Sequence, residues 1–173
     1  MNKLSTLCKP VLIFAFCALV IITANAQSFT EHFDNITTLA GNGWSIQNNS
    51  NPVGSISWFQ GNNTVFSAYD GTATAYIGVN FNSTGNNGDI SNWLIAPEVT
   101  FKNGDVITFY TRTVSAPQYP DRLQVWLSTN GASTNVGATT TSVGDFTNLL
   151  VDINPNLNTT DYPNIWTQYT ITL

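Results

Sequence analysis

Short runs in which apolar and polar residues alternate are the main pattern of the chain after residue 27. Alternation with a period of two puts every second side chain on one face, as in a half-buried β-strand. In 123–128, for example, Leu123, Val125 and Leu127 share one face, and Trp126 lies on the other. Apolar residues do not recur at helical spacing over two or more turns in this part of the sequence. The pattern predicts strands at 28–33, 55–59, 73–79, 92–96, 106–112, 123–128, 149–153 and 166–173.

Turn signals separate these runs. Dipeptides and tripeptides that suit a backbone with positive φ stand between them: Asn42-Gly43, Asp70-Gly71, Asn87-Gly88-Asp89, Asn103-Gly104 and Asn130-Gly131. About eight short strands with regular turns and no helices are typical of an all-β fold, and we predict a jelly-roll-like β-sandwich of two antiparallel sheets. No break in composition divides 27–173, so we predict a single domain there.

The C-terminal strand has an unusual end. The sequence stops at Leu173 within an apolar run, with no turn or polar cap after it. A strand in this position leaves a sheet edge open unless another strand pairs with it. We therefore expect the domain at 27–173 to be truncated at its C-terminus, with further strands closing the sandwich.

The first 26 residues have the three parts of a secretory signal peptide. Lys3 and Lys9 form the positive start, 11–22 is a run of twelve apolar residues, and Ala24-Asn25-Ala26 offers a cleavage site. Twelve residues are too few for a membrane-spanning helix, which needs about 20. We predict cleavage, no membrane insertion afterwards, and a secreted, extracellular or outer-surface location.

Composition narrows the classes of function. Both cysteines, Cys8 and Cys17, lie in the signal peptide, which excludes a disulfide scaffold, a thiol enzyme and a cysteine-ligated zinc site for 27–173. The exported part carries three cationic residues against ten carboxylates, a net charge of −7. Binding to nucleic acid requires clustered lysine and arginine, so nucleic acid is excluded as a partner.

Residues for bond-breaking chemistry are scarce. Glycosidases need two carboxylates at a defined separation, but the only glutamates, Glu31 and Glu98, do not lie together in an acidic strand. The single histidine, His32, is not accompanied by a Gly-x-Ser-x-Gly motif. We expect the protein not to be an enzyme.

Oxygen ligands make a structural calcium ion the one cofactor to consider. Glu31 and Asp34 bracket the end of the first predicted strand, where alternation directs Glu31 to the same side as two phenylalanines. A carboxylate among apolar neighbours needs a partner, which is either a cation held by Glu31 and Asp34 or one of the arginines Arg112 and Arg122. The stretch from Asp152 to Asn158 starts like a calcium loop but lacks its glycine and its final glutamate.

A flat aromatic side chain on an open face could bind a sugar. Trp126 is the candidate, because alternation places it opposite Leu123, Val125 and Leu127. We expect the other four tryptophans to fill the core: Trp58, Trp93 and Trp166 stand next to Phe, Leu or Ile, and Trp44 lies two residues before Ile46.

Several fragments in a fixed order resemble a known family. They are Glu31-His32-Phe33-Asp34, Gly43-Trp44, Ser57-Trp58-Phe59-Gln60-Gly61, Ala75-Tyr76-Ile77-Gly78, Ser91-Asn92-Trp93-Leu94-Ile95-Ala96-Pro97, Arg122-Leu123-Gln124-Val125, Leu127-Ser128-Thr129-Asn130-Gly131 and Trp166-Thr167-Gln168-Tyr169-Thr170. From about Phe29 to Leu173 the chain resembles the choice-of-anchor J domain, which is related to the cleaved-adhesin domains of secreted bacterial haemagglutinin-proteases. The resemblance implies a jelly-roll sandwich on an exported bacterial protein, with calcium bound in several members.

Two departures from the family pattern stand out. The stretch after Gly43-Trp44 is Gln47-Asn48-Asn49-Ser50-Asn51 where related domains are rich in aspartate, and the strands beyond the Trp-x-x-Tyr strand are missing. Residues and resemblance together predict a non-catalytic adhesion or ligand-binding module for an extracellular protein or glycan. The alternative is a carbohydrate-binding or accessory module of a secreted enzyme.

Overall fold

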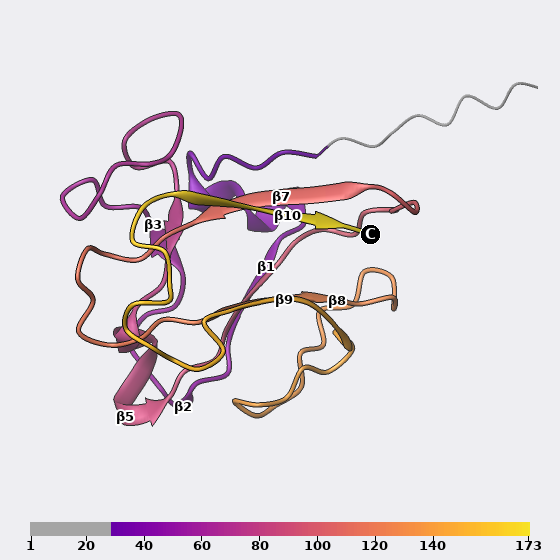
Figure 1. Ribbon diagram of the computed structural model, residues 1–173. Helices are drawn as coiled ribbons and strands as arrows, with labels where there is room; N and C mark the ends of the chain where they lie inside the picture. The colour runs from indigo at the N-terminus through magenta and orange to yellow at the C-terminus, as the bar shows by residue number, and fades with distance from the viewer. Residues whose placement is uncertain (1–28) are drawn as a thin grey trace, which may run out of the picture.

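The structure, a computed structural model, describes residues 29–173, and this part of the chain is all-β (Figure 1). It contains three 3₁₀-helices, η1 (Ile36–Thr38), η2 (Ala40–Asn42) and η3 (Phe81–Ser83), and ten strands. The strands are β1 (Ser45–Asn48), β2 (Asn51–Val53), β3 (Phe59–Gln60), β4 (Ile77–Gly78), β5 (Thr84–Asp89), β6 (Asn92–Ile95), β7 (Val106–Thr111), β8 (Leu123–Leu127), β9 (Asn148–Ile153) and β10 (Thr167–Thr172). The predicted signal peptide, 1–26, lies outside the described residues. None of the helices within 29–173 has the length and apolar character needed to cross a membrane.

The strands form five antiparallel pairs: β1–β6, β2–β5, β3–β4, β7–β10 and β8–β9. In the view of Figure 1 the β7–β10 pair lies above the β8–β9 pair, and β1 runs between them. Each pair joins strands that are separated in sequence or by a long loop, so the pairs depend on contacts between distant segments. The predicted all-β fold is confirmed. The arrangement as two jelly-roll sheets stays a prediction.

The β7–β10 pair has one inner and one outer face. On the inner face the rings of Phe109 and Tyr169 stack with centroids 5.5 Å apart, and Ile171 is buried. The alternate positions form the outer face, where Tyr110 lies opposite Gln168, and Thr108 lies opposite Thr170. The outer face therefore carries mainly polar and aromatic side chains.

The apolar core is small and centres on the β1–β6 and β8–β9 pairs. Ile95 in β6 packs with Val136 and Phe146 from the long connection between β8 and β9. Val136 is 1% exposed, and Trp93 and Trp126 pack against the same cluster. The segment that joins β8 to β9 therefore supplies two of the three central core residues.

Five predicted strands are confirmed nearly in full, those at 92–96, 106–112, 123–128, 149–153 and 166–173. The runs at 55–59 and 73–79 shrink to the two-residue strands β3 and β4. The strand expected at 28–33 is wrong for its described part, because 29–33 is irregular and Phe33 has a φ of 56°. A left-handed φ at a bulky residue interrupts the extended backbone that a strand requires.

Candidate ligand-binding site

Two tyrosines from distant parts of the sequence stack on the outer face of the β7–β10 pair. Tyr69 lies in the loop between β3 and β4, and Tyr110 lies in β7. Their ring centroids are 3.7 Å apart and the ring planes differ by 18°. Tyr69 is still 55% exposed, and because Tyr110 covers one side of its ring, this exposure falls on the other side and on the edge. We call this pair the tyrosine platform.

Tyr110 is fixed by the neighbouring strand. Its hydroxyl donates a hydrogen bond to Oε1 of Gln168, with the two oxygens 3.0 Å apart, and Gln168 is its direct partner in the register of β10. The Tyr69 hydroxyl beside it, together with partial desolvation, raises the pKa of Tyr110 above the ordinary value of 10.0. Its hydroxyl is therefore neutral at physiological pH and remains a hydrogen-bond donor.

A second group of aromatic rings supports the loop that carries Tyr69. Phe66 from this loop stacks on the buried Tyr76 at 4.9 Å and meets Trp166 edge-on at 5.7 Å. The indole nitrogen of Trp166 donates to the carbonyl oxygen of Ser67 at 2.8 Å. The guanidinium carbon of Arg112 lies 4.3 Å from the Phe66 ring centroid, a cation–π contact. These contacts tie the loop to the β7–β10 pair.

The ends of the same loop are also held. Nε2 of Gln60 donates to the carbonyl oxygens of Phe33 and Thr74, at 2.8 and 2.6 Å. Gly61 is buried, and a Cβ there would clash with the ring of Tyr76 and come within 2.7 Å of the Thr74 oxygen. Only glycine permits this close approach, so the sequence fixes the point at which the loop leaves β3.

Glu31 and Asp34, the predicted cation ligands, lie in the irregular segment before η1. Glu31 is half-buried, and its Oε1 accepts the backbone N–H of Phe33 at 2.7 Å. This bond gives the carboxylate a partner that belongs neither to a cation nor to Arg112 or Arg122. Within 29–173, no group of three or more His, Cys, Asp or Glu side chains could hold a metal ion. A calcium ion at Glu31 and Asp34 stays a prediction.

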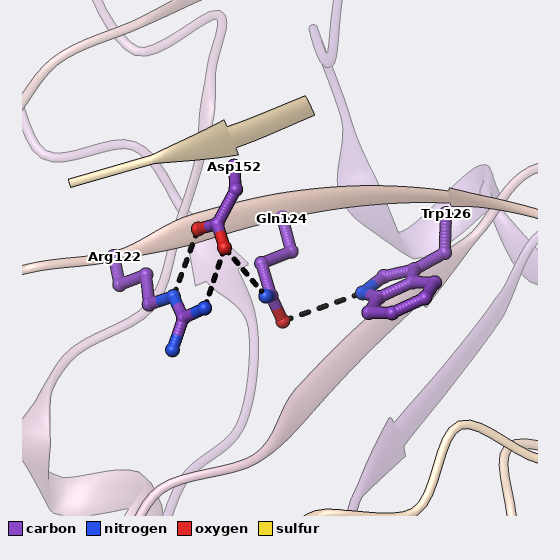
Figure 2. A network of polar contacts seen from close by, with 4 residues as sticks. All are labelled: Arg122, Gln124, Trp126 and Asp152. Carbon is purple, nitrogen blue, oxygen red and sulfur yellow. Dashed lines mark hydrogen bonds and ion pairs between the residues drawn. The ribbon is translucent and has the colours of Figure 1, made fainter. Parts of the chain in front are cut away.

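Trp126, the predicted sugar-binding residue, is half-buried in β8 and packs against the core cluster of Ile95, Val136 and Phe146. Its indole nitrogen donates to Oε1 of Gln124 at 3.3 Å (Figure 2). Stacking of a sugar needs an open ring face, and part of the Trp126 side chain is covered by this packing. Trp126 as the sugar-binding residue stays a prediction. Tyr69, which is 55% exposed, is more accessible than the half-buried Trp126.

Figure 2 shows that Trp126 ends a line of polar contacts along one face of the β8–β9 pair. Arg122 donates to both carboxylate oxygens of Asp152, through Nε at 2.8 Å and through Nη2, and Nε2 of Gln124 donates to Asp152 at 3.0 Å. The Arg122 guanidinium holds the pKa of the Asp152 carboxyl below its usual range, and Asp152 raises the pKa of Arg122. The network orients Gln124, which in turn positions the indole.

Replacing Arg122 by alanine should lower the free energy of unfolding by about 0.5–1 kcal/mol at pH 7, the range for a well-aligned pair near the surface. Asp152 has a lowered pKa in the folded state, so the pair stabilises the fold above the unfolded pKa of about 3.9 and loses this effect as the pH falls through the folded pKa. Urea denaturation at pH 7 and pH 2 measures the loss of stability and its dependence on pH. Lys102→Ala, which removes an exposed cation, is the matched control. An equal loss for Arg122→Ala at the two pH values would contradict the role of Asp152.

Two open clefts lie away from these residues. One of about 310 Å³ is lined by Ala116, Pro117, Thr159, Thr160, Tyr162 and Asn164. The other, of about 440 Å³, is lined by Asn48, Asn49, Ser50, Asn51, Val53, Ala138, Thr139 and Thr140. Neither lining includes an Asp, Glu, Lys, Arg or His side chain, and burial raises the pKa of Tyr162 to about 12 from its ordinary 10.0. Neither cleft includes Glu31, Asp34 or Trp126.

The sequence alone does not predict the tyrosine platform. Alternation in 106–112 places Tyr110 on the face opposite Phe109, which is a signal for its outward position. Tyr69, however, stands directly before the Asp70-Gly71 turn, outside any alternating run, and its partner is far away in the sequence. The stacking of the two rings follows only from the tertiary structure.

Comparison with known proteins gives no relative for this chain. No family model matches it, and no curated protein and no solved structure is similar enough to count as a match. The resemblance to the choice-of-anchor J domain therefore rests on the fragments quoted above.

Proposed function

We propose that the chain is a non-catalytic module, exported from a bacterial cell, that binds an extracellular ligand as an adhesion domain does. The observation that carries the proposal is the tyrosine platform, two stacked rings on a sheet face, of which Tyr69 is exposed and Tyr110 is half-buried. Aromatic side chains gathered on a surface bury a large apolar area when a ligand covers them, and such patches occur at binding sites. Tyrosine suits such sites because it offers a large contact area and loses little side-chain entropy on binding.

The positions of the acid–base residues support binding rather than catalysis. His32 and Glu98 are both exposed, and Glu31 is engaged with the backbone of its own segment. A catalytic acid or base usually has a pKa tuned by burial and by a charged neighbour. The strongest ionic contact described, between Arg122 and Asp152, stabilises two adjacent strands.

The second candidate, a carbohydrate-binding or accessory module of a secreted enzyme, is favoured by the same rings. Its predicted sugar-binding residue is Trp126, and the tyrosine platform, with the exposed Tyr69, offers a second surface for a sugar. The coding sequence beyond Leu173 separates the two candidates: a catalytic domain there favours the accessory role, and a sorting or anchoring tail favours the adhesion role.

A solid-phase binding experiment tests the proposed function. The purified chain is incubated with immobilised collagen, fibronectin, mucin and neutral polysaccharides, and with chromogenic glycoside, ester and peptide substrates. We expect saturable binding to at least one immobilised material, reduced by the double substitution Tyr69→Ala and Tyr110→Ala, and no turnover above the blank. Tyr119→Ala, which removes a lone tyrosine that is 77% exposed, is the control. Turnover, or no binding to any material, would contradict the proposal.

A further inference from the structure

Contacts with the rest of the structure hold both rings of the tyrosine platform. Tyr69 is stacked on Tyr110, and Tyr110 is bonded to Gln168 of the neighbouring strand. The loop that carries Tyr69 is held at its start by Gln60 and Gly61 and in its middle by Phe66. A binding surface that is already ordered loses little conformational entropy when it binds. The exposed ring face of Tyr69 is therefore suited to a ligand with a flat apolar face.

The strand positions around the platform are uncharged and mostly polar, with the exposed Val106 at the far end of the face. On the outer face of the β7–β10 pair, Thr108, Thr170 and Thr172 carry hydroxyl groups, and all three are exposed. Gln168 is also exposed. Its Oε1 accepts the hydrogen bond from the Tyr110 hydroxyl, and its amide nitrogen donates to no other residue within 29–173. These groups can donate hydrogen bonds to ligand hydroxyls and accept hydrogen bonds from them.

The distribution of charge around the platform disfavours both anionic ligands and basic proteins. Neither β7 nor β10 contains a charged residue, although the whole chain has a net charge of −5. The nearby Asp70 bonds to the backbone N–H of Gly71, and the cation of Arg112 is engaged with Phe66 and with the carbonyl oxygen of Asn164. An anionic ligand would be repelled by the chain as a whole, and a basic protein would find no carboxylate on these two strands.

We infer that Tyr69 and Gln168 form a binding site for a neutral glycan. This inference rests on the proposed binding function and names its ligand class. One apolar face of a pyranose ring stacks on the open side of Tyr69, and its hydroxyls accept hydrogen bonds from the Gln168 amide. From Tyr110 to Val106 the outer face extends over about 13 Å, at about 3.3 Å per residue. Thr108 and Thr170 lie along this length, so a short run of sugar units binds rather than a single one.

Isothermal titration with defined oligosaccharides tests the site. The probes are the neutral β-1,4-linked hexamers of glucose, mannose, xylose and N-acetylglucosamine and the β-1,3-linked hexamer of glucose. At least one is expected to bind the purified full chain. Tyr69→Ala should weaken that binding roughly tenfold or more, whereas Tyr69→Phe, which keeps the ring, should change it less than about threefold. Gln168→Met keeps the length of the side chain and removes its donors, and it should weaken binding several-fold.

The controls separate this inference from the proposed function. Tyr119→Ala should bind like the wild type, and all variants should melt within a few degrees of it, because the replaced side chains are exposed. Binding of a hexamer that is unchanged in Tyr69→Ala overturns the site. Binding to an immobilised protein in the solid-phase experiment, with none of the hexamers bound in solution, overturns the glycan inference and leaves the binding function intact. If the chain binds no immobilised material and no hexamer, both the proposed binding function and the glycan site are contradicted.

Discussion

Replacing Gly144 by alanine is expected to destabilise the domain by about 3–5 kcal/mol, as the sum of backbone strain and an overlap that cannot be relieved. Gly144 has a φ of 54°, and an added Cβ would lie 2.6 Å from the carbonyl carbon of Asn135, closer still to its oxygen, and 2.7 Å from the nitrogen of Gly137. All of these atoms belong to the backbone and cannot rotate away. Asp145, the residue after Gly144, also contacts Asn135: its backbone N–H donates a hydrogen bond to the Asn135 carbonyl oxygen at 2.9 Å.

The effect should reach the core, because Val136 follows Asn135 and is 1% exposed. Two glycines serve as graded controls in urea denaturation. Gly104 has a φ of 92° and Gly41 does not have a positive φ, and neither would bring a Cβ within 4 Å of another group. We expect Gly104→Ala to cost about 1–2 kcal/mol, from the backbone alone, and Gly41→Ala to be close to neutral. A cost for Gly144→Ala no larger than that for Gly104→Ala would mean that the two segments do not pack this closely.

Alternation predicted the strands that are built from apolar and β-branched residues, and it failed for β5. The sequence of β5 is Thr-Gly-Asn-Asn-Gly-Asp, without an apolar residue, and its Asn87-Gly88-Asp89 pattern predicts a turn. In the structure this segment pairs with β2, and the hydroxyl of Thr84 donates to the Pro52 oxygen at 2.8 Å. A Cβ on Gly88 would clash with the backbone of Asn51. Glycine in a strand marks a close approach of two backbones, which the sequence of one strand does not distinguish from a turn.

The segment before η1 shows the opposite error. The spacing of Phe29 and Phe33 predicted a strand, and both rings do pack on the same residue, Trp44, with centroids 5.8 and 5.6 Å away. The shared contact with Trp44 agrees with a position of both rings on one side, but the predicted backbone was wrong, since Phe33 adopts a left-handed φ. The direction predicted for Glu31 depended on the strand, and a local hydrogen bond to Phe33 determines it instead. Local side-chain bonds to the backbone compete with regular structure in this way.

The candidate binding site could be predicted only in part for a related reason. The outward position of Tyr110 follows from its strand, but the partner ring comes from a loop whose path depends on Gln60, Gly61 and Phe66. Trp126 was correctly placed on the face opposite Val125, yet that face packs against the core. Alternation distinguishes two faces of a strand but does not indicate which of them another segment covers.

The second large effect is expected for Phe146→Ala, which should lower the free energy of unfolding by about 3–5 kcal/mol. Phe146 is 9% exposed and forms the core cluster with Ile95 and Val136. Its ring centroid lies 5.5 Å from that of Trp93. Truncation to alanine removes the buried apolar area and leaves a cavity that the irregular connection between β8 and β9 fills only partly. Since a domain of this size is typically stable by about 5–15 kcal/mol, the loss is a large share of the total.

Urea denaturation followed by tryptophan fluorescence measures this change, and the Trp93 environment makes the signal sensitive to the cluster itself. Phe81→Ala is the matched control, because the same side chain there is 71% exposed and its removal should change stability by less than about 0.5 kcal/mol. Phe146→Leu should fall between the two, because it keeps most of the buried volume. Equal costs for Phe146→Ala and Phe81→Ala would show that Ile95, Val136 and Phe146 are not the centre of the core, since the same truncation can differ between two sites only through the neighbours that each ring contacts.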